Sequence, residues 1–168
     1  GARQTMSNVT FADVPFPARV LGLGGVIPFA GCAAVFWILF DSAPFWAWKA
    51  FEAQLFYGVV ILSFLGAIHW GSVLVEGAGA EQVWFRLGWS VTPALLAWLA
   101  ALMNPVPAVL TLIVGMAAAY FMDLRARDQG WFPGWYLALR KVLTLAVIVS
   151  LAASFVRHRT STYQSRQG

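Results

Sequence analysis

Six ionisable residues stand out in this apolar chain, because the expected helices bring them to one level. His69 lies in the string "ILSFLGAIHWG" (61–71). Glu76 follows seven residues later, on the same face of a helix. The other four sit at or near the ends of further apolar runs: Arg19, Arg86, Asp123 and Arg140. An imidazole can ligate metal or haem, and such a cluster can bind a polar molecule, so chemistry is most plausible here.

The composition identifies the surroundings of these residues. Of 168 residues, 60% are hydrophobic and only 11% are charged, whereas soluble domains have about 25% charged residues. The chain therefore lacks the polar residues needed to cover a water-exposed surface, and we expect an integral membrane protein. The net charge of +4 belongs to residues that flank apolar runs. That pattern indicates orientation in the lipid bilayer, and no nucleic-acid partner is expected.

Five apolar runs predict an all-α, polytopic bundle of five transmembrane helices. Their expected ranges are 18–40, 51–76, 83–103, 106–122 and 136–156. Pro28 predicts a kink in the first helix. Small residues spaced by four predict close helix packing, for example Ser63, Ala67 and Gly71 in the second helix. The transmembrane domain would thus cover residues 18–156, between an N-terminal segment (1–17) and a polar C-terminal tail (157–168) expected to be mobile.

The ends of the chain carry few signals of their own. The start, "GARQTMSNVTF", is not typical of a cleavable signal peptide. Met6 is a plausible native start, so residues 1–5 carry no weight in the interpretation. The single cysteine, Cys32, lies inside an apolar run. It excludes an intrachain disulfide and a zinc site made of cysteines.

The distribution of basic residues predicts the orientation. Five crossings place the termini on opposite sides, with loop 41–50 on the side of the C-terminus. Seven basic residues then share the N-terminal side and four the other. The seven are Arg3, Arg19, Arg86, Arg125, Arg127, Arg140 and Lys141, and the four are Lys49, Arg157, Arg159 and Arg166. The excess of positive charge places the N-terminus in the cytoplasm, or in the matrix of a mitochondrion.

The depth of His69 requires it to face the bundle. At a rise of about 1.5 Å per residue it lies about 8 Å inside the hydrocarbon. A neutral imidazole facing lipid would leave a donor and an acceptor unsatisfied. We therefore expect the ring to meet a polar group on another helix or a water. Arg140 or Lys141 is expected to pair with Asp123, because they lie at the same end of adjacent helices.

Three roles for this polar cluster remain open. The first is structural, with His69 fixing the register between helices. The second is a binding site for a quinone, a lipid head group or a small solute. The third is haem or metal ligation by His69, and this is the least favoured. His158, the other histidine, falls in the tail on the opposite side, so a bis-histidine haem within one chain is disfavoured and no metal site is predicted.

Catalytic motifs are missing from the sequence. It contains no paired-carboxylate motif, HExxH motif, phosphate-binding glycine loop or nucleophile elbow. The "LGLGG" string at 21–25 lies in an expected span with no strand before it, so it indicates helix packing rather than dinucleotide binding. The chain is thus not expected to be an enzyme.

Four strings carry a family resemblance: "LGLGGVIPF" (21–29), "YGVVILSFLGAIHWG" (57–71), "GWSVTPALLAW" (88–98) and "WYLALRKVLT" (135–144). Over residues 15–157 the chain resembles an uncharacterised family of small bacterial and mitochondrial inner-membrane proteins that includes transmembrane protein 69. The resemblance implies five membrane helices and an inner-membrane location, with no known activity. Ala67 departs from the glycine expected there, which weakens the case for close backbone approach at that residue.

Two classes of function follow. The first is a non-catalytic accessory or assembly subunit of a larger respiratory or photosynthetic membrane complex, in contact with other subunits or with copies of itself. The second is a binder or transporter of a small molecule, quinone or lipid that uses the His69 cluster. Bound lipid or quinone is then the candidate cofactor.

Overall fold

The computed structural model describes residues 9–164, and every regular element in this part of the chain is a helix. A short 3₁₀ helix, η1 (Phe11–Asp13), precedes six α-helices. These are α1 (Phe16–Gly24), α2 (Ile27–Leu39), α3 (Pro44–Glu76), α4 (Val83–Ala101), α5 (Pro105–Asp128) and α6 (Gly134–Gln164). The all-helical class predicted from the sequence is confirmed.

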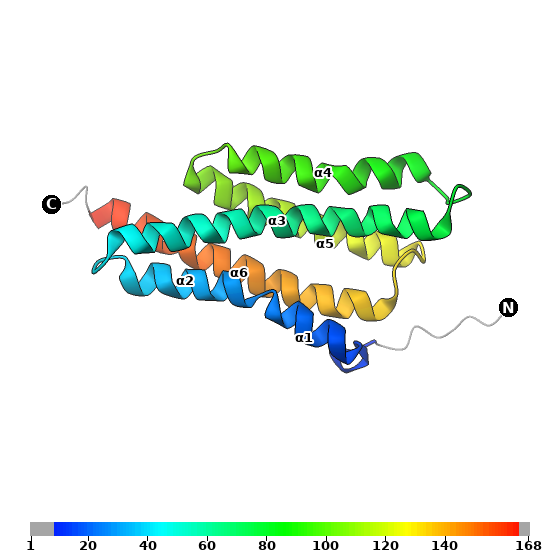
Figure 1. Ribbon diagram of the computed structural model, residues 1–168, viewed down its shortest axis with the longest axis horizontal. Helices are drawn as coiled ribbons and strands as arrows, with labels where there is room; N and C mark the ends of the chain where they lie inside the picture. The colour runs from blue at the N-terminus through cyan, green and yellow to red at the C-terminus, as the bar shows by residue number, and fades with distance from the viewer. Residues whose placement is uncertain (1–8, 165–168) are drawn as a thin grey trace.

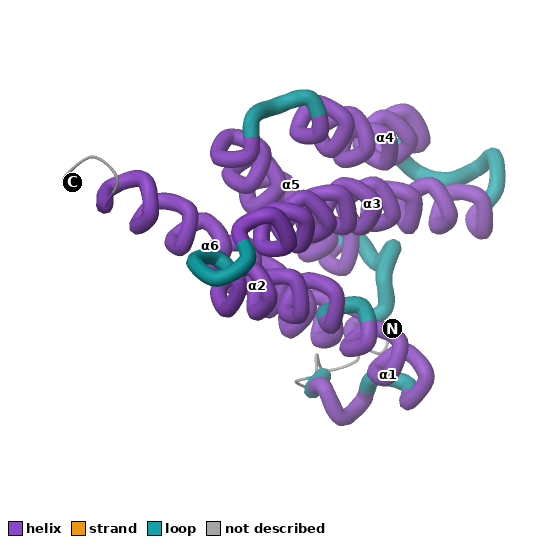
Figure 2. The backbone as a smooth tube through the Cα atoms, turned by 60° about the vertical axis from the view of Figure 1, so that its left-hand side comes forward, coloured by secondary structure: helices purple, strands orange, loops and turns teal. Residues whose placement is uncertain are grey.

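The helices run side by side along the long axis of the bundle (Figure 1). The central helix α3 packs against α2, α4 and α5, and α6 closes the bundle against α2 and α5. Figure 2 shows α4 at one edge, beside α3 and α5 and away from α2 and α6. The core between them is built from large apolar side chains, among them Phe29, Phe36, Phe51, Leu62, Leu112, Met116 and Leu151.

Several helices are longer than predicted. The second expected helix begins at Pro44 rather than at residue 51, and α5 begins at Pro105 and continues to Asp128 rather than 122. Proline is common at the first helical position, because a backbone N–H at that position would have no partner inside the helix. The α6 helix continues through the part predicted as a polar tail as far as Gln164, beyond the end of the fifth apolar run at 156. Residues 1–5, which carry no weight in the sequence interpretation, lie outside the described residues.

The first expected helix is broken, and the break lies at Gly25 and Val26, between α1 and α2. Pro28 follows in the first turn of α2 and cannot donate a backbone hydrogen bond. Side chains of α3 satisfy carbonyl groups around this break. The Tyr57 hydroxyl donates to the Gly25 carbonyl oxygen at 2.9 Å, and Gln54 Nε2 donates to that of Phe29 at 3.1 Å. Such partners are needed wherever a membrane helix is interrupted.

Four helical segments in the described part are long and apolar enough to cross a membrane: 16–39 (α1 with α2), α3, α5 and residues 134–160 of α6. The third predicted span, α4, is not among them. It has 19 residues, about the thickness of the hydrocarbon layer at the rise of a helix. However, its sequence includes Arg86, Ser90, Thr92 and Pro93 together with three tryptophans, all of which lower its mean hydropathy.

The predicted packing face of α3 is corrected by the structure. Ala67 is exposed, and Ser63 and Gly71 are only half-buried. The buried face instead carries Gly58, Leu62, Leu65, Gly66, His69 and Val73. Here Gly66 lies against the backbone of Ser90 in α4, where a Cβ would overlap the carbonyl oxygen. The close contact between helices therefore lies at Gly66, on the face of α3 next to the predicted one. This face turns inward because it also carries His69.

Candidate functional site

Three helices meet at a buried ion pair extended by an imidazole. Asp123 of α5 accepts from Arg140 Nε of α6 through Oδ2 at 2.7 Å, and its Oδ1 lies 2.8 Å from His69 Nε2 of α3. All three residues are buried. The predictions that His69 faces the bundle and that Arg140 pairs with Asp123 are therefore confirmed. The arrangement ties α3, α5 and α6 together through one carboxylate.

Aromatic side chains cover this group at the start of α6. The ring centroid of Phe132 lies 4.7 Å from that of His69, and Tyr136 packs on Phe132 at 5.0 Å. The hydroxyl of Tyr136 is buried without a hydrogen-bond partner among the described residues. Asp123 is buried among these side chains, and its two carboxylate oxygens bond to His69 and Arg140.

A second ion pair joins α3 to α4. Arg86 donates to both carboxylate oxygens of Glu76, from Nη1 at 2.7 Å and from Nη2 at 2.6 Å. Its guanidinium carbon also lies 4.3 Å from the ring centroid of Trp131. Two parallel hydrogen bonds make such a pair stronger and fix its geometry better than a single hydrogen bond would. Glu76 is therefore the partner of Arg86.

Ser72 connects the two ion pairs. Its hydroxyl donates to the backbone carbonyl of His69 at 2.8 Å and accepts from Arg86 Nη2 at 2.9 Å. Five of the six predicted cluster residues thus lie in one hydrogen-bonded region at one end of the bundle. Arg19, the sixth, forms no ion pair among the described residues, and its guanidinium lies 6.0 Å from the Phe16 ring. Lys141 is exposed and takes no part.

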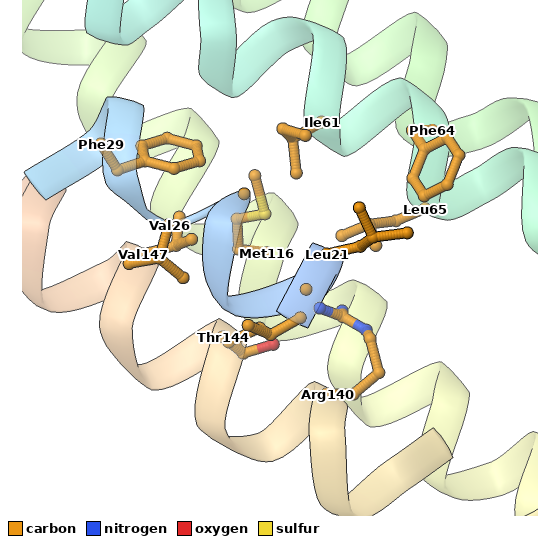
Figure 3. Close-up of a pocket in the computed structure, with 13 residues that line it drawn as sticks. Leu21, Val26, Phe29, Ile61, Phe64, Leu65, Met116, Arg140, Thr144 and Val147 are labelled. Atoms are coloured by element: carbon orange, nitrogen blue, oxygen red, sulfur yellow. The ribbon is translucent and has the colours of Figure 1, made fainter. Parts of the chain in front are cut away.

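A cavity adjoins Arg140. Its volume is about 150 Å³, and it lies between α1, α2, α3, α5 and α6. Figure 3 shows the guanidinium of Arg140 and the hydroxyl of Thr144 extending from α6 toward it, among Leu21, Phe64 and Leu65. Both Arg140 Nη2 and Thr144 Oγ1 are buried and have no hydrogen-bond partner among the described atoms.

Sequence reasoning missed Thr144, Tyr136 and Ser72. A spacing signal was present for all three. Tyr136, Arg140 and Thr144 are spaced by four and so share one face of a helix. Ser72 has the i+3 spacing from His69 that places it one turn away. Neither spacing could show that Thr144 meets a cavity, since that depends on the break between α1 and α2.

The geometry presents buried polar groups that can hold a ligand. His69 and Asp123 resemble the base and orienting acid of a hydrolase, but within residues 9–164 no hydroxyl or thiol is hydrogen-bonded to His69 Nδ1, the ring nitrogen that Asp123 leaves free. The described residues also contain no group of three His, Cys, Asp or Glu side chains that could hold a metal ion.

A known protein family matches the part of the chain that contains these residues. The family described as "Protein of unknown function (DUF3429)" matches residues 14–156. The chain is 37% identical over 155 residues to transmembrane protein 69 of Xenopus tropicalis, covering 91% of the chain and 59% of that protein. It is 33% identical over 153 residues to transmembrane protein 69 of Mus musculus, covering 89% and 60% respectively. No solved structure matches the chain.

The chain spans about three-fifths of the length of these relatives. Their names and the apolar helices agree on a multi-pass membrane protein. Neither the family description nor the names of the relatives give an activity.

Proposed function

Because the chain belongs to the DUF3429 family of membrane proteins of unknown function, we propose that it is a non-catalytic accessory or assembly subunit of a larger membrane complex. We place that complex in a bacterial or mitochondrial inner membrane, with a respiratory or photosynthetic complex as the expected setting. The observation that carries the proposal is the exposed face of α4, which combines two tryptophans with a small-residue step at Gly88 and Thr92.

This face, here called the α4 stripe, runs the whole length of the helix. It consists of residues on one side of the helix that are all exposed: Trp84, Gly88, Val91, Thr92, Leu95, Trp98 and Leu99. Trp84 is 93% exposed. The α4 helix runs beside α3 (Figure 1), so we expect it to cross the membrane with α3, although it is not among the helices whose length and composition alone predict a span.

A transmembrane helix of another subunit is the occupant that fits the stripe. Gly88 and Thr92 form a small-residue step at i and i+4, the spacing that lets two membrane helices approach closely. The Thr92 hydroxyl already donates to the Gly88 carbonyl at 2.9 Å, so it presents its methyl group without an unsatisfied donor. A partner helix at this step would shield the polar backbone and the tryptophans on either side.

The test uses two matched glycine variants. Gly88 lies on the stripe and Gly31 lies on the exposed side of α2, and no described atom lies within 4 Å of a Cβ added at either residue. Wild type, Gly88→Leu and Gly31→Leu are each expressed with an affinity tag in the native membrane. Each is then purified in mild detergent. Mass spectrometry then measures the stoichiometry of any co-purifying membrane protein.

We expect wild type and Gly31→Leu to retain a partner at fixed stoichiometry, and Gly88→Leu to lose it. A second copy of this chain as the retained species would identify the complex as a homo-oligomer. The proposal is wrong if no membrane protein is retained by the wild type, or if Gly88→Leu retains it as well as Gly31→Leu does.

A further inference from the structure

The cavity beside Arg140 has the features of a binding site that is independent of the α4 stripe. Its walls are apolar apart from two side chains of α6, Arg140 and Thr144. A volume of about 150 Å³ resembles that of an engineered apolar cavity that accommodates one benzene molecule. The cavity therefore has room for a head group of about one six-membered ring.

Two buried donors point into this space without partners. Arg140 and Thr144 are each 4% exposed, and Arg140 Nη2 and Thr144 Oγ1 have no hydrogen bond among the described atoms. A helical threonine usually donates to the carbonyl of residue i−4, but Thr144 makes no such bond here. Leaving two buried polar atoms unsatisfied costs free energy, and an acceptor oxygen in the cavity would remove that cost.

The charge of the site favours a neutral acceptor. Arg140 is already paired with Asp123 at 2.7 Å, so their formal charges cancel. An anionic head group would add an uncompensated charge inside a membrane span, which is costly. A carbonyl oxygen adds none and can accept from both Arg140 Nη2 and Thr144 Oγ1.

The mouth of the cavity faces the outer surface of the bundle. Leu21 and Phe64, which line it, are 76% and 61% exposed. Both belong to segments apolar enough to cross a membrane, so this mouth opens to lipid. A ligand would enter from the bilayer and leave its apolar tail between these two side chains (Figure 3).

We infer that this cavity binds a neutral, lipid-soluble molecule through a carbonyl oxygen held by Arg140 and Thr144, with a single-ring quinone as the best fit in size. The ester carbonyl of a membrane lipid has the same chemistry. Binding holds the ligand without altering it, and no covalent or redox step is part of the inference.

The test measures binding of decyl-benzoquinone to the full chain in nanodiscs made of ether-linked phospholipids, which lack ester carbonyls. Three ligands are compared by equilibrium dialysis: decyl-benzoquinone, decylbenzene and the anion of decylbenzoic acid. We expect saturable binding of one quinone per chain, and weaker binding of the other two. Repeating the measurement in ester-linked lipid identifies the natural source. Competition there points to a lipid ester, and unchanged affinity points to a quinone.

Thr144→Val removes one donor and keeps the Arg140–Asp123 pair, so the bundle should remain folded. We expect quinone affinity to fall roughly five- to tenfold, the size of one lost hydrogen bond. The matched control is Thr160→Val, farther along the same helix, whose hydroxyl donates to the Arg157 carbonyl, and it should bind like the wild type. A photoreactive quinone should crosslink to segments 21–29 and 140–147, a result that needs no variant. Absence of saturable quinone binding, equal affinity in Thr144→Val, or tighter binding of the anion would overturn the inference.

Discussion

Gly66 of α3 lies so close to Ser90 of α4 that a Cβ added to the glycine would overlap the serine carbonyl oxygen. The obstacle is backbone, flanked by the ring of Pro93 at 3.2 Å from the same position, so no side-chain rotation can relieve it. This contact sets the distance between α3 and α4 and lets Arg86 of α4 reach Glu76 of α3.

We therefore predict that Gly66→Ala destabilises the protein in detergent by about 1–3 kcal/mol, as overpacking does. The control is Gly71→Ala, five residues along the same helix, where no described atom lies within 4 Å of the added Cβ. It should be neutral or stabilising by up to about 1 kcal/mol, because alanine favours a helix more than glycine does. Unfolding by a denaturing detergent measures both, and equal stability of the two variants would show that α3 and α4 are not in close contact.

Removing the charge of Asp123 should be more damaging. Asp123→Asn keeps the size of the side chain but leaves Arg140 buried without its counter-ion, at a cost of about 3–5 kcal/mol. Asp41→Asn is the control, because Asp41 also pairs with an arginine, Arg157, but is 83% exposed. That variant should lose less than about 1 kcal/mol. Thermal unfolding in one detergent compares them, and an Asp123→Asn protein as stable as Asp41→Asn would mean that Arg140 reaches water.

The Arg86–Glu76 pair should hold the turn between α3 and α4. The Arg86 side chain is fully buried and Glu76 is its bidentate partner, so Glu76→Gln removes the charge that balances Arg86. We expect faster hydrogen exchange in residues 77–86, measured by mass spectrometry. Glu52→Gln, which breaks the exposed Lys49–Glu52 pair, should leave exchange in that segment unchanged. The pair has no such role if both variants exchange at the wild-type rate.

The sequence predicted the partners that depend on helix ends and missed those that depend on helix breaks. Arg140 and Asp123 could be paired in advance, because a short connection between two helices brings the end of one beside the start of the next. The inward direction of His69 followed from the cost of an imidazole in lipid. The cavity could not be foreseen, because it forms where Gly25 and Val26 interrupt the first helix, and Thr144 becomes its donor only there. The buried face of α3 was misplaced because small residues occur on several faces of a membrane helix.

The orientation in the membrane remains a prediction, and single cysteines can test it. In a Cys32→Ser background, Ser42→Cys probes the connection between α2 and α3, and Ala78→Cys probes that between α3 and α4. These connections lie at opposite ends of α3, whose 33 residues exceed the thickness of the hydrocarbon layer. The excess of positive charge on the N-terminal side predicts that Ala78→Cys faces the cytoplasm or matrix, and that Ser42→Cys faces the other side together with Ser165→Cys. An impermeant maleimide applied to intact bacteria or mitoplasts should then label Ser42→Cys and Ser165→Cys but reach Ala78→Cys only after the membrane is opened. Labelling of Ala78→Cys alone would reverse the orientation, and labelling of Ser42→Cys and Ser165→Cys from opposite sides would mean that one of the helices between them, α4 above all, does not cross.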